Sequence, residues 1–396
     1  MRVLLIVGLL SSPGGLATST FRIARAMKKA GDDVLIVTRD KHDHSPGGFG
    51  RVKTSSVDGL MVHYFPDLWF RGEAYGLCCL ELRKLAEEFE PDVVHAYFVF
   101  PCAYLGAVVA RHRGIPLVVS CRGSDVCHHI LIRPASLRLA LRTADHVTAV
   151  SDSLLQWGRM VSSFKASSPV YNSIDADFAP NGAASVAELR RRFGFSPDAT
   201  VLGSNAVFVW QKGAEYLEFL LDRLAMSDLP NLEFALIGQY SEELKARLTQ
   251  KFEKPSGEKK SRRLIAVPQP SRHDLSSLLA SLDLFVLTSR REGMPNVLLE
   301  AMSCGTAVAA TAVNGCVDLL SDPEAGLLMD PFDPGKGAQA ILQLLADPER
   351  LKHYAAFGRE LVQKKYSVEE ELRQIRKIYR SGNANSIDLR SCGKTH

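Results

Sequence analysis

Two acidic residues, Glu292 and Glu300, stand eight positions apart in a stretch that carries both loop and helix signals. The apolar run 282–288 before them predicts a buried strand. Pro295 is suited to the first turn of a helix, and Gly305 is suited to its C-terminal end. We therefore expect Glu292 on a loop at the carboxyl end of a strand, and Glu300 about two turns into the following helix. Carboxylates in these positions can accept hydrogen bonds from the hydroxyl groups of a sugar-like ligand.

The start of this predicted helix is also suited to an anion, because free backbone N–H groups point out of a helix N-terminus. The candidate binding residues there are consecutive: Gly293, Met294, Pro295, Asn296 and Val297. The alternative is an ordinary surface loop followed by a solvated helix glutamate. We favour the binding interpretation, because a carboxylate at position 300 among apolar neighbours is costly unless it has a partner.

Two further segments follow strands and carry residues that suit phosphate groups. Gly14 and Gly15 come after the first apolar run, where glycines let the backbone approach a ligand. Lys212, next to Gly213, follows the first predicted strand of the second half and can neutralise a diphosphate. A tight turn and a solvated lysine are the ordinary alternatives. Diphosphate binding by Lys212 is favoured, because chain order places it on the same sheet edge as Glu292.

Arg122 and His95 each stand at the end of another apolar strand. An arginine there can bind phosphate or carboxylate. A histidine can donate a hydrogen bond or act as a base near neutral pH, although a lone histidine at a strand end is more often structural. Both residues are therefore candidates for a site at the carboxyl edge of the first sheet.

The composition is that of a globular protein with two domains. The chain has 396 residues, of which 46% are hydrophobic and 23% charged, with a formal net charge of +4 and a sequence pI of about 8.5. This charge is too small to indicate nucleic acid binding, but it is compatible with an anionic ligand. None of the eight cysteines forms a Cys-x-x-Cys pair, so the sequence indicates no zinc site.

The expected location is the cytoplasm. The cysteines are scattered through apolar segments, which favours a reducing compartment. The N-terminal apolar run is short and leads into a glycine turn and a basic helix, so we interpret it as a first strand and not as a signal peptide. No apolar stretch is long enough to cross a bilayer.

Apolar strands and amphipathic helices alternate along the chain, which predicts an α/β protein with parallel sheets wrapped by helices. The expected strands are 3–10, 34–38, 60–65, 93–96, 117–120, 146–150, 169–171, 200–208, 232–237, 264–267, 282–288 and 306–311. A polar stretch at about 175–197 separates the two halves. The predicted domains are 1–178, joined by a C-terminal crossover helix at 367–381, and 196–366. Residues 382–396 are predicted to form a flexible tail.

Taken together, these segments resemble glycosyltransferase family 4, whose members are retaining nucleotide-sugar transferases of the GT-B fold. The strongest part is Glu292-Gly-Met-Pro-Asn-Val-Leu-Leu-Glu300, which is similar to the Glu-x7-Glu motif of that family. Other parts of the family pattern are matched by 172–175, 313–318, 326–333 and 366–379. The resemblance covers nearly the whole chain.

The resemblance implies two Rossmann-like, doubly wound parallel-sheet domains that face each other across a cleft. It also implies that Glu292 contacts sugar hydroxyls and that Glu300 contacts the ribose of the nucleotide. Lys212 would face the diphosphate, as would the loop at Gly14 and Gly15. The donor substrate would be a nucleoside diphosphate sugar, with no metal and no other cofactor.

By the same resemblance the protein is a retaining glycosyltransferase of cell-envelope polysaccharide or glycolipid synthesis. The leaving phosphate itself helps to deprotonate a hydroxyl acceptor, so charge neutralisation at the diphosphate matters more than a protein base. The candidate catalytic residues are Glu292, His95 and Arg122. The acceptor is left open among a sugar, a lipid-linked molecule and a small molecule, with contacts expected on loops 41–57 and 98–104.

Three positions depart from the family pattern. Val207 stands where an arginine is usual, Arg122 replaces a common histidine, and Tyr97 stands where a second histidine is common. These departures concern phosphate stabilisation and sugar positioning and hardly touch the fold. We predict that Lys212 carries the diphosphate contact largely without an arginine partner, unless Arg122 compensates.

Three other functions are compatible with parts of the pattern. A nucleotide-sugar epimerase and a non-catalytic nucleotide-sugar-binding or partner subunit would keep the same fold. An NAD-dependent Rossmann enzyme fits poorly, because the Gly-x-Gly-x-x-Gly fingerprint is absent.

Contact with a membrane surface is a separate hypothesis. Segment 130–142 carries Arg138 and Arg142 beside a leucine face, and Arg111 and Arg113 precede it. Such a cationic, partly apolar rim suits peripheral contact with anionic lipid. The alternative is that the leucine face packs on its own sheet and the arginines are its solvated side.

Overall fold

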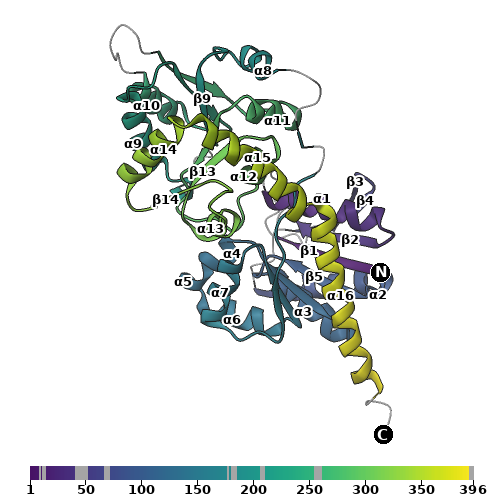
Figure 1. Ribbon diagram of the computed structural model, residues 1–396. Helices are drawn as coiled ribbons and strands as arrows, with labels where there is room; N and C mark the ends of the chain where they lie inside the picture. The colour runs from purple at the N-terminus through teal and green to yellow at the C-terminus, as the bar shows by residue number, and fades with distance from the viewer. Residues whose placement is uncertain are drawn as a thin grey trace. The chain divides into compact units, whose positions relative to one another are not determined.

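A computed structural model describes residues 1–8, 10, 15–40, 52–66, 72–175, 178–179, 185–205, 210–253 and 261–391 (Figure 1). The chain divides into two compact units, Met1–Ser173 with Val368–His396, and Ile174–Ser367. The predicted boundary lay between residues 178 and 196, a little further along the chain. Each unit is an α/β layer structure with its own sheet, as the alternation of strands and helices predicts.

The sheet of the first unit has eight strands in the order β3-β4-β2-β1-β5-β6-β7-β8. All neighbours are parallel except β3 and β4. The strands are β1 (Arg2–Val7), β2 (Asp33–Arg39), β3 (Lys53–Val57), β4 (Leu60–Phe65), β5 (Val93–Tyr97), β6 (Leu117–Cys121), β7 (His146–Ala149) and β8 (Ser167–Pro169). The strand order reverses between β1 and β5, and ligands of open α/β sheets bind at the carboxyl end of such a switch point.

Eight helices belong to the described part of the first unit. They are α1 (Gly15–Lys29), α2 (Gly72–Phe89), α3 (Cys102–Arg113), α4 (Ser124–Cys127), α5 (His129–Ile132), α6 (Pro134–Thr143), α7 (Asp152–Val161) and α16 (Val368–Ser391). Helix α16 comes from the far end of the sequence and packs beside α1 (Figure 1). Its residues Ile375, Ile378 and Tyr379 are buried in the same apolar cluster as strands β1 and β2.

The sheet of the second unit has six parallel strands in the order β11-β10-β9-β12-β13-β14. This is the doubly wound order, in which the switch point lies between β9 and β12. The strands are β9 (Thr200–Asn205), β10 (Leu232–Ile237), β11 (Arg262–Val267), β12 (Leu284–Leu287), β13 (Ala307–Thr311) and β14 (Leu327–Met329). Its core is apolar and is centred on residues such as Leu202, Phe234 and Leu284.

The helices of the second unit cover both faces of this sheet. They are α8 (Val186–Arg192), the 3₁₀ turn η1 (Trp210–Lys212), α9 (Ala214–Ala225), α10 (Glu242–Phe252), α11 (Arg272–Ala280), α12 (Asn296–Ser303), α13 (Asn314–Leu319), α14 (Pro334–Leu345) and α15 (Pro348–Lys365). No helix in the described ranges is both long enough and apolar enough to cross a membrane.

The predicted α/β class and parallel sheets are confirmed, and the differences are local. Strand β3 was not predicted, because it is polar and exposed and lacks apolar alternation. The sequence feature that could have revealed β3 is the Asp58-Gly59 pair. Both residues have positive φ, as a two-residue hairpin turn requires. Helix α16 continues past the predicted end at 381 to Ser391, since no proline interrupts its backbone hydrogen bonds.

Candidate functional site

An ion pair lies at the switch point of the second sheet. Lys212, on the turn after β9, donates from Nζ to Oε1 of Glu292, which follows β12, at 2.6 Å. The hydroxyl of Ser289 donates to the same oxygen at 2.6 Å. The Lys212 side chain is 29% exposed and that of Glu292 is 12% exposed. A cation and a carboxylate are thus held together at the sheet edge where chain order had predicted both.

The turn that carries Lys212 is packed tightly against the end of β12. Gly213 has a φ of +63°, and a Cβ added there would lie 2.0 Å from the carbonyl oxygen of Thr288. The Thr288 hydroxyl donates to the carbonyl oxygens of Lys212, at 3.1 Å, and of Gly213, at 3.2 Å. Only glycine allows this approach, so Gly213 sets where the lysine stands.

The loop after β12 leads into α12, as predicted, but the helix starts later. Pro295 is the N-cap residue with an extended backbone, and it makes no side-chain cap hydrogen bond. Helix α12 begins at Asn296, so Glu300 lies little more than one turn into the helix, where two turns were predicted. The loop before α12 lies against the start of α13, where a Cβ on Gly315 would be 2.0 Å from the carbonyl oxygen of Gly293.

The candidate residues on this loop differ in exposure. Met294 and Pro295 are buried, whereas Gly293, Asn296, Val297 and Glu300 are half-buried. Glu300 lies one turn before Cys304, and burial, with the charge of Glu300 as a smaller cause, raises the pKa of that thiol to about 12. The predicted carboxylates therefore flank the first turn of α12.

Sequence reasoning missed several residues that shape this edge. Ser289 donates a hydrogen bond to the Glu292 carboxylate. Its position directly after the strand, three residues before the glutamate, could have indicated this contact. Arg290 donates its backbone N–H to Gln211 at 2.7 Å, and its guanidinium lies 5.0 Å from the ring centroid of Trp210. Trp210 is 64% exposed. These contacts tie the Lys212 turn to the Glu292 loop across the switch point.

Arg122 occupies the corresponding edge of the first sheet, directly after β6. Its Nη2 donates to Ser19 Oγ on α1 at 2.8 Å and to Asn172 Oδ1 at 2.7 Å. Its guanidinium carbon lies 4.8 Å from the ring centroid of Tyr97, at the end of β5. The end of β5 and the segments that follow β1, β6 and β8 therefore meet at this arginine.

His95 is enclosed within the first unit and does not line an open site. It is 1% exposed, and its Nδ1 and Nε2 lie 2.7 Å from the hydroxyls of Tyr379 and Ser120. Ser120 Oγ in turn lies 2.5 Å from Thr148 Oγ1. Burial, and then the charges of Arg122 and His146, hold the pKa of His95 well below 6.5. The contacts are those of a neutral core histidine, so a catalytic role for His95 stays a prediction that no contact supports.

Gly14, Val207 and residues 41–51 of the predicted acceptor loop lie outside the described residues. Gly15 is the first residue of α1. Within the ranges that the structure describes, no group of three or more histidine, cysteine or acidic residues could hold a metal ion.

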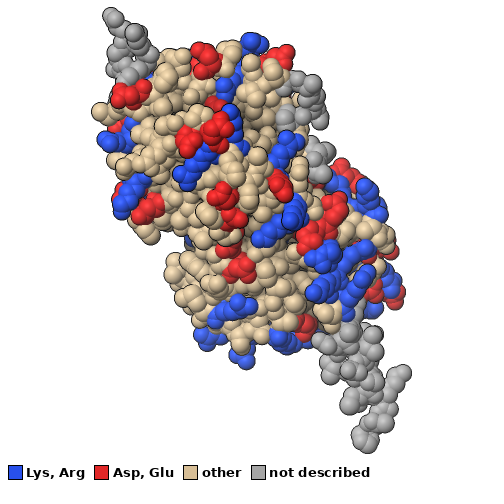
Figure 2. Space-filling view, viewed as in Figure 1, with Lys and Arg blue, Asp and Glu red and all other residues tan. Residues whose placement is uncertain are grey.

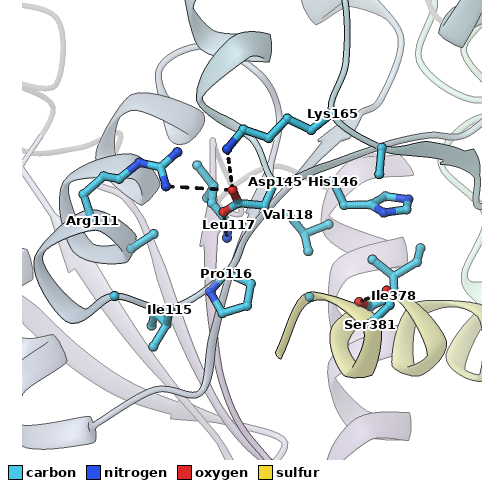
Figure 3. A pocket seen from close by; sticks show the side chains of 14 residues that line it. Arg111, Ile115, Pro116, Leu117, Val118, Asp145, His146, Lys165, Ile378 and Ser381 are labelled. Atoms are coloured by element: carbon cyan, nitrogen blue, oxygen red, sulfur yellow. Dashed lines mark hydrogen bonds and ion pairs between the residues drawn. The ribbon is translucent and has the colours of Figure 1, made fainter. Parts of the chain in front are cut away.

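A cavity of about 550 Å³ lies at the opposite, amino-terminal edge of the first sheet (Figure 3). Arg111 and Lys165 both point at Asp145 there, with N–O distances of 3.8 and 2.7 Å. Ile378 and Ser381 of α16 line another side. This cavity is separate from the edge that carries Arg122. Arg111 is 56% exposed and also donates to the carbonyl oxygen of Thr143 at the end of α6, at 3.0 Å.

Comparison with known proteins gives the family. Residues 13–178 match the family described as Glycosyltransferase Family 4, and residues 185–361 match the one described as Glycosyl transferases group 1. The chain is 26% identical over 325 residues to an uncharacterized glycosyltransferase, MJ1178, of Methanocaldococcus jannaschii, covering 81% of this chain and 84% of that protein. It is 28% identical over 316 residues to an N-acetyl-alpha-D-glucosaminyl L-malate synthase of Bacillus anthracis, with coverage of 76% and 77%.

The solved structures agree on the fold. Anabaena HepE, in complex with UDP and glucose, superposes with a TM-score of 0.75 at 20% identity, over 96% of this chain and 100% of that chain. Two doubly wound parallel sheets with this likeness define the GT-B class of glycosyltransferases. The chain belongs to glycosyltransferase family 4, which confirms the resemblance seen in its motifs.

Proposed function

We propose that this glycosyltransferase moves a sugar from a nucleoside diphosphate sugar to a hydroxyl acceptor, with retention of configuration and without a metal. The observation that carries the proposal is the Lys212–Glu292 pair at the switch point of the second sheet. It offers a cation for a diphosphate and a carboxylate for sugar hydroxyls at one sheet edge. The binding of UDP and glucose by Anabaena HepE supports a donor of this class.

In this mechanism the bond between the sugar C1 and the diphosphate oxygen breaks, and the acceptor oxygen bonds to C1 on the same face. The acceptor proton passes to the leaving phosphate. Lys212 and the backbone N–H groups at the start of α12 stabilise the negative charge that develops on that phosphate. Glu292 holds a sugar hydroxyl, and Glu300 accepts hydrogen bonds from the ribose.

The first test is ligand selection. A thermal shift panel with UDP, GDP, ADP and NAD should show stabilisation by one nucleoside diphosphate and none by NAD. Mass spectrometry of the purified protein with a set of nucleotide sugars should then show release of that nucleotide. An isomerised nucleotide sugar without transfer would indicate an epimerase instead, and binding without turnover would indicate a non-catalytic subunit.

Variants of the proposed site sharpen this test. Glu300→Ala should weaken nucleotide binding about tenfold or more, because a hydrogen bond to a charged group contributes about 1.5–3 kcal/mol. Glu292→Ala should mainly lower turnover. The matched control is Glu242→Ala, since Glu242 is 82% exposed and pairs only with an exposed lysine in the described structure. Unchanged affinity and turnover in both site variants would refute the site.

We further propose that the enzyme works in the cytoplasm, on cell-envelope polysaccharide or glycolipid precursors, in peripheral contact with an anionic membrane. None of the seven cysteines in the described ranges is in a disulfide. The predicted leucine face of α6 is partly buried, through Leu137 and Leu141, but Leu139 is 57% exposed. Leu131 and Ile132 on α5 are 78% and 55% exposed.

Basic residues surround these exposed apolar side chains. Residues 126–144 include Arg133, Arg138 and Arg142 and contain no acidic residue. Figure 2 shows largely uncharged surface over this part of the first unit, with basic side chains along its lower margin. Apolar side chains ringed by arginines suit a surface of anionic lipid, to which each basic residue contributes on the order of 1 kcal/mol.

Co-sedimentation with liposomes tests the membrane contact. The protein should co-sediment with anionic vesicles at low salt and dissociate from them as the salt concentration rises. It should not co-sediment with neutral vesicles. Leu131→Ser with Leu139→Ser should reduce sedimentation, whereas Leu80→Ser on α2, also exposed, should not. Protein that stays in the supernatant with anionic vesicles at low salt would show that the acceptor is met in solution.

A further inference from the structure

Arg122 is held in one orientation by contacts from separate segments. Both hydrogens of its Nη2 are used, by Ser19 Oγ at 2.8 Å and by Asn172 Oδ1 at 2.7 Å. The Tyr97 ring packs against the guanidinium at 4.8 Å. These partners fix the plane of the guanidinium before any ligand arrives, which reduces the entropy that binding must cost.

The nearest carboxylates do not contact this guanidinium. Asp125 lies three residues on, but its oxygens accept the backbone N–H groups of Val99, Arg122 and Gly123 at 2.8–3.1 Å. Within the described residues, Arg122 makes no ion pair with any acidic side chain. A half-buried arginine is thus left with a positive charge that no carboxylate contacts.

A second cation and a second acid lie close by and are also engaged. Arg22 on α1 is 2% exposed, and its Nε donates to Ser173 Oγ at 3.2 Å. Glu371 on α16 accepts from the backbone N–H of Ser173 at 3.1 Å and from its hydroxyl at 2.5 Å. Glu371 therefore faces Ser173, so it does not reach Arg122 through any contact in the described structure.

Three N–H donors remain on Arg122. A guanidinium carries five N–H donors, and those on Nε and Nη1 have no acceptor in the described structure. Nε–H and the Nη1 hydrogens point in different directions, so each atom can donate a separate charge-assisted hydrogen bond to an oxygen of a carboxylate or phosphate. The Tyr97 hydroxyl is buried and also lacks a partner among the described residues.

The position of these donors in the fold points to a substrate. Arg122 follows β6, Ser19 and Asn172 follow β1 and β8, and Tyr97 ends β5, so the cluster lies at the carboxyl edge of the sheet, next to the switch point. A contact that only joined these segments would need the Nη2 hydrogen bonds alone. The unused donors and the positive charge, at the ligand-binding end of the sheet, suit an anion.

We propose that Arg122 binds an anionic group, a carboxylate or a phosphate, carried either by the acceptor or by the sugar that is transferred. This inference rests on the proposed function and adds to it the charge of a substrate. Arg122 is then a specificity-determining residue, which selects an anionic sugar over its neutral counterpart.

Two arms of one binding experiment distinguish the sources. In the acceptor arm, glucose, glucuronate and glucose 6-phosphate are titrated by calorimetry into the protein saturated with UDP. In the donor arm, UDP-glucose and UDP-glucuronate are titrated into the free protein. We expect the anionic ligand to bind about tenfold or more tightly than the neutral one in one arm. The arm that shows the preference identifies which substrate carries the anion.

The variants ask whether Arg122 is responsible for that preference. Arg122→Gln should bring the affinities for anionic and neutral ligands within about threefold, and Arg122→Lys should keep part of the difference because a lysine keeps the charge but not the planar, oriented guanidinium. The control is Arg25→Gln, also on the first unit, where Arg25 is exposed and pairs with Asp58 at 2.7 Å. It should leave the preference unchanged.

Asn172→Ala keeps the experiment decisive where Arg122→Gln does not fold. It leaves the charge in place but loosens the guanidinium, so the preference should fall to an intermediate value. Equal affinities for anionic and neutral ligands in both arms, with UDP still bound, would overturn this inference and leave the proposed function standing. So would a preference that survives in Arg122→Gln. A wild-type protein that binds none of UDP, GDP, ADP and their nucleotide sugars would contradict both the inference and the proposed function.

Discussion

Replacing Lys212 by methionine should weaken UDP binding, whereas replacing Glu292 by glutamine should not. In the free protein, Lys212 Nζ lies 2.6 Å from Glu292 Oε1, so each charge partly satisfies the other. A diphosphate must draw the lysine away from this carboxylate. Lys212→Met removes the cation that the diphosphate needs, whereas Glu292→Gln removes the competitor and leaves the cation in place.

The expected change in UDP affinity follows from the free energy of one hydrogen bond to a charged group. A hydrogen bond to a charged group contributes about 1.5–3 kcal/mol, so Lys212→Met should weaken UDP by about 10- to 150-fold. Glu292→Gln should leave UDP affinity unchanged or raise it several-fold. The same Glu292→Gln variant should lower turnover with a nucleotide sugar, because its carboxylate no longer holds a sugar hydroxyl.

The stability of the free protein gives an independent check. Lys212→Met leaves Glu292, which is only 12% exposed, with Ser289 as its remaining partner, at a cost of about 1–3 kcal/mol. Glu292→Gln should cost less, because Lys212 is 29% exposed and can turn towards water. The double variant should be more stable than the sum of the two single costs predicts.

Hydrogen exchange over peptides of β9 and β12 measures these costs within the second unit, and calorimetry with UDP measures the affinities. The control pair is Lys245 and Glu242, whose side chains are 40% and 82% exposed. Its coupling should be below about 1 kcal/mol. Equal weakening of UDP by Lys212→Met and Glu292→Gln, or strictly additive stability costs, would refute the reasoning.

Three further outcomes are expected. Since burial holds the pKa of His95 well below 6.5, the unfolded chain gains a proton below about pH 6.5 that the folded protein does not take up. The free energy of unfolding should therefore fall by up to about 1.4 kcal/mol per pH unit below that point, and a slope that is no smaller in His95→Gln would contradict this. Gly213→Ala should lower the melting temperature and UDP affinity more than Gly31→Ala, which has positive φ but open space around it, and equal effects would count against the close contact. Tyr379→Phe should destabilise the first unit by about 1–3 kcal/mol in urea unfolding, by leaving a buried nitrogen of His95 unpaired, and should leave UDP affinity unchanged.

Much of the fold could be predicted because its signals are local. Buried parallel strands are apolar runs, so β10 was predicted with its observed bounds. The alternation of strands and helices implies parallel connections, and these put the residues after each strand on one edge. For this reason Lys212 and Glu292 could be assigned to the same edge from chain order alone. Strand β3 escaped prediction because its exposed residues carry no apolar pattern.

The contacts within the candidate sites were decided only by the tertiary structure. His95 meets Tyr379, 284 residues away in sequence, and this contact makes it a core residue. Arg122 owes its orientation to Ser19 and Asn172, which come from distant segments. The types of these residues and their places at strand ends are properties of the sequence. Which side chains are paired depends on how long-range packing brings the segments together, and no local periodicity encodes that.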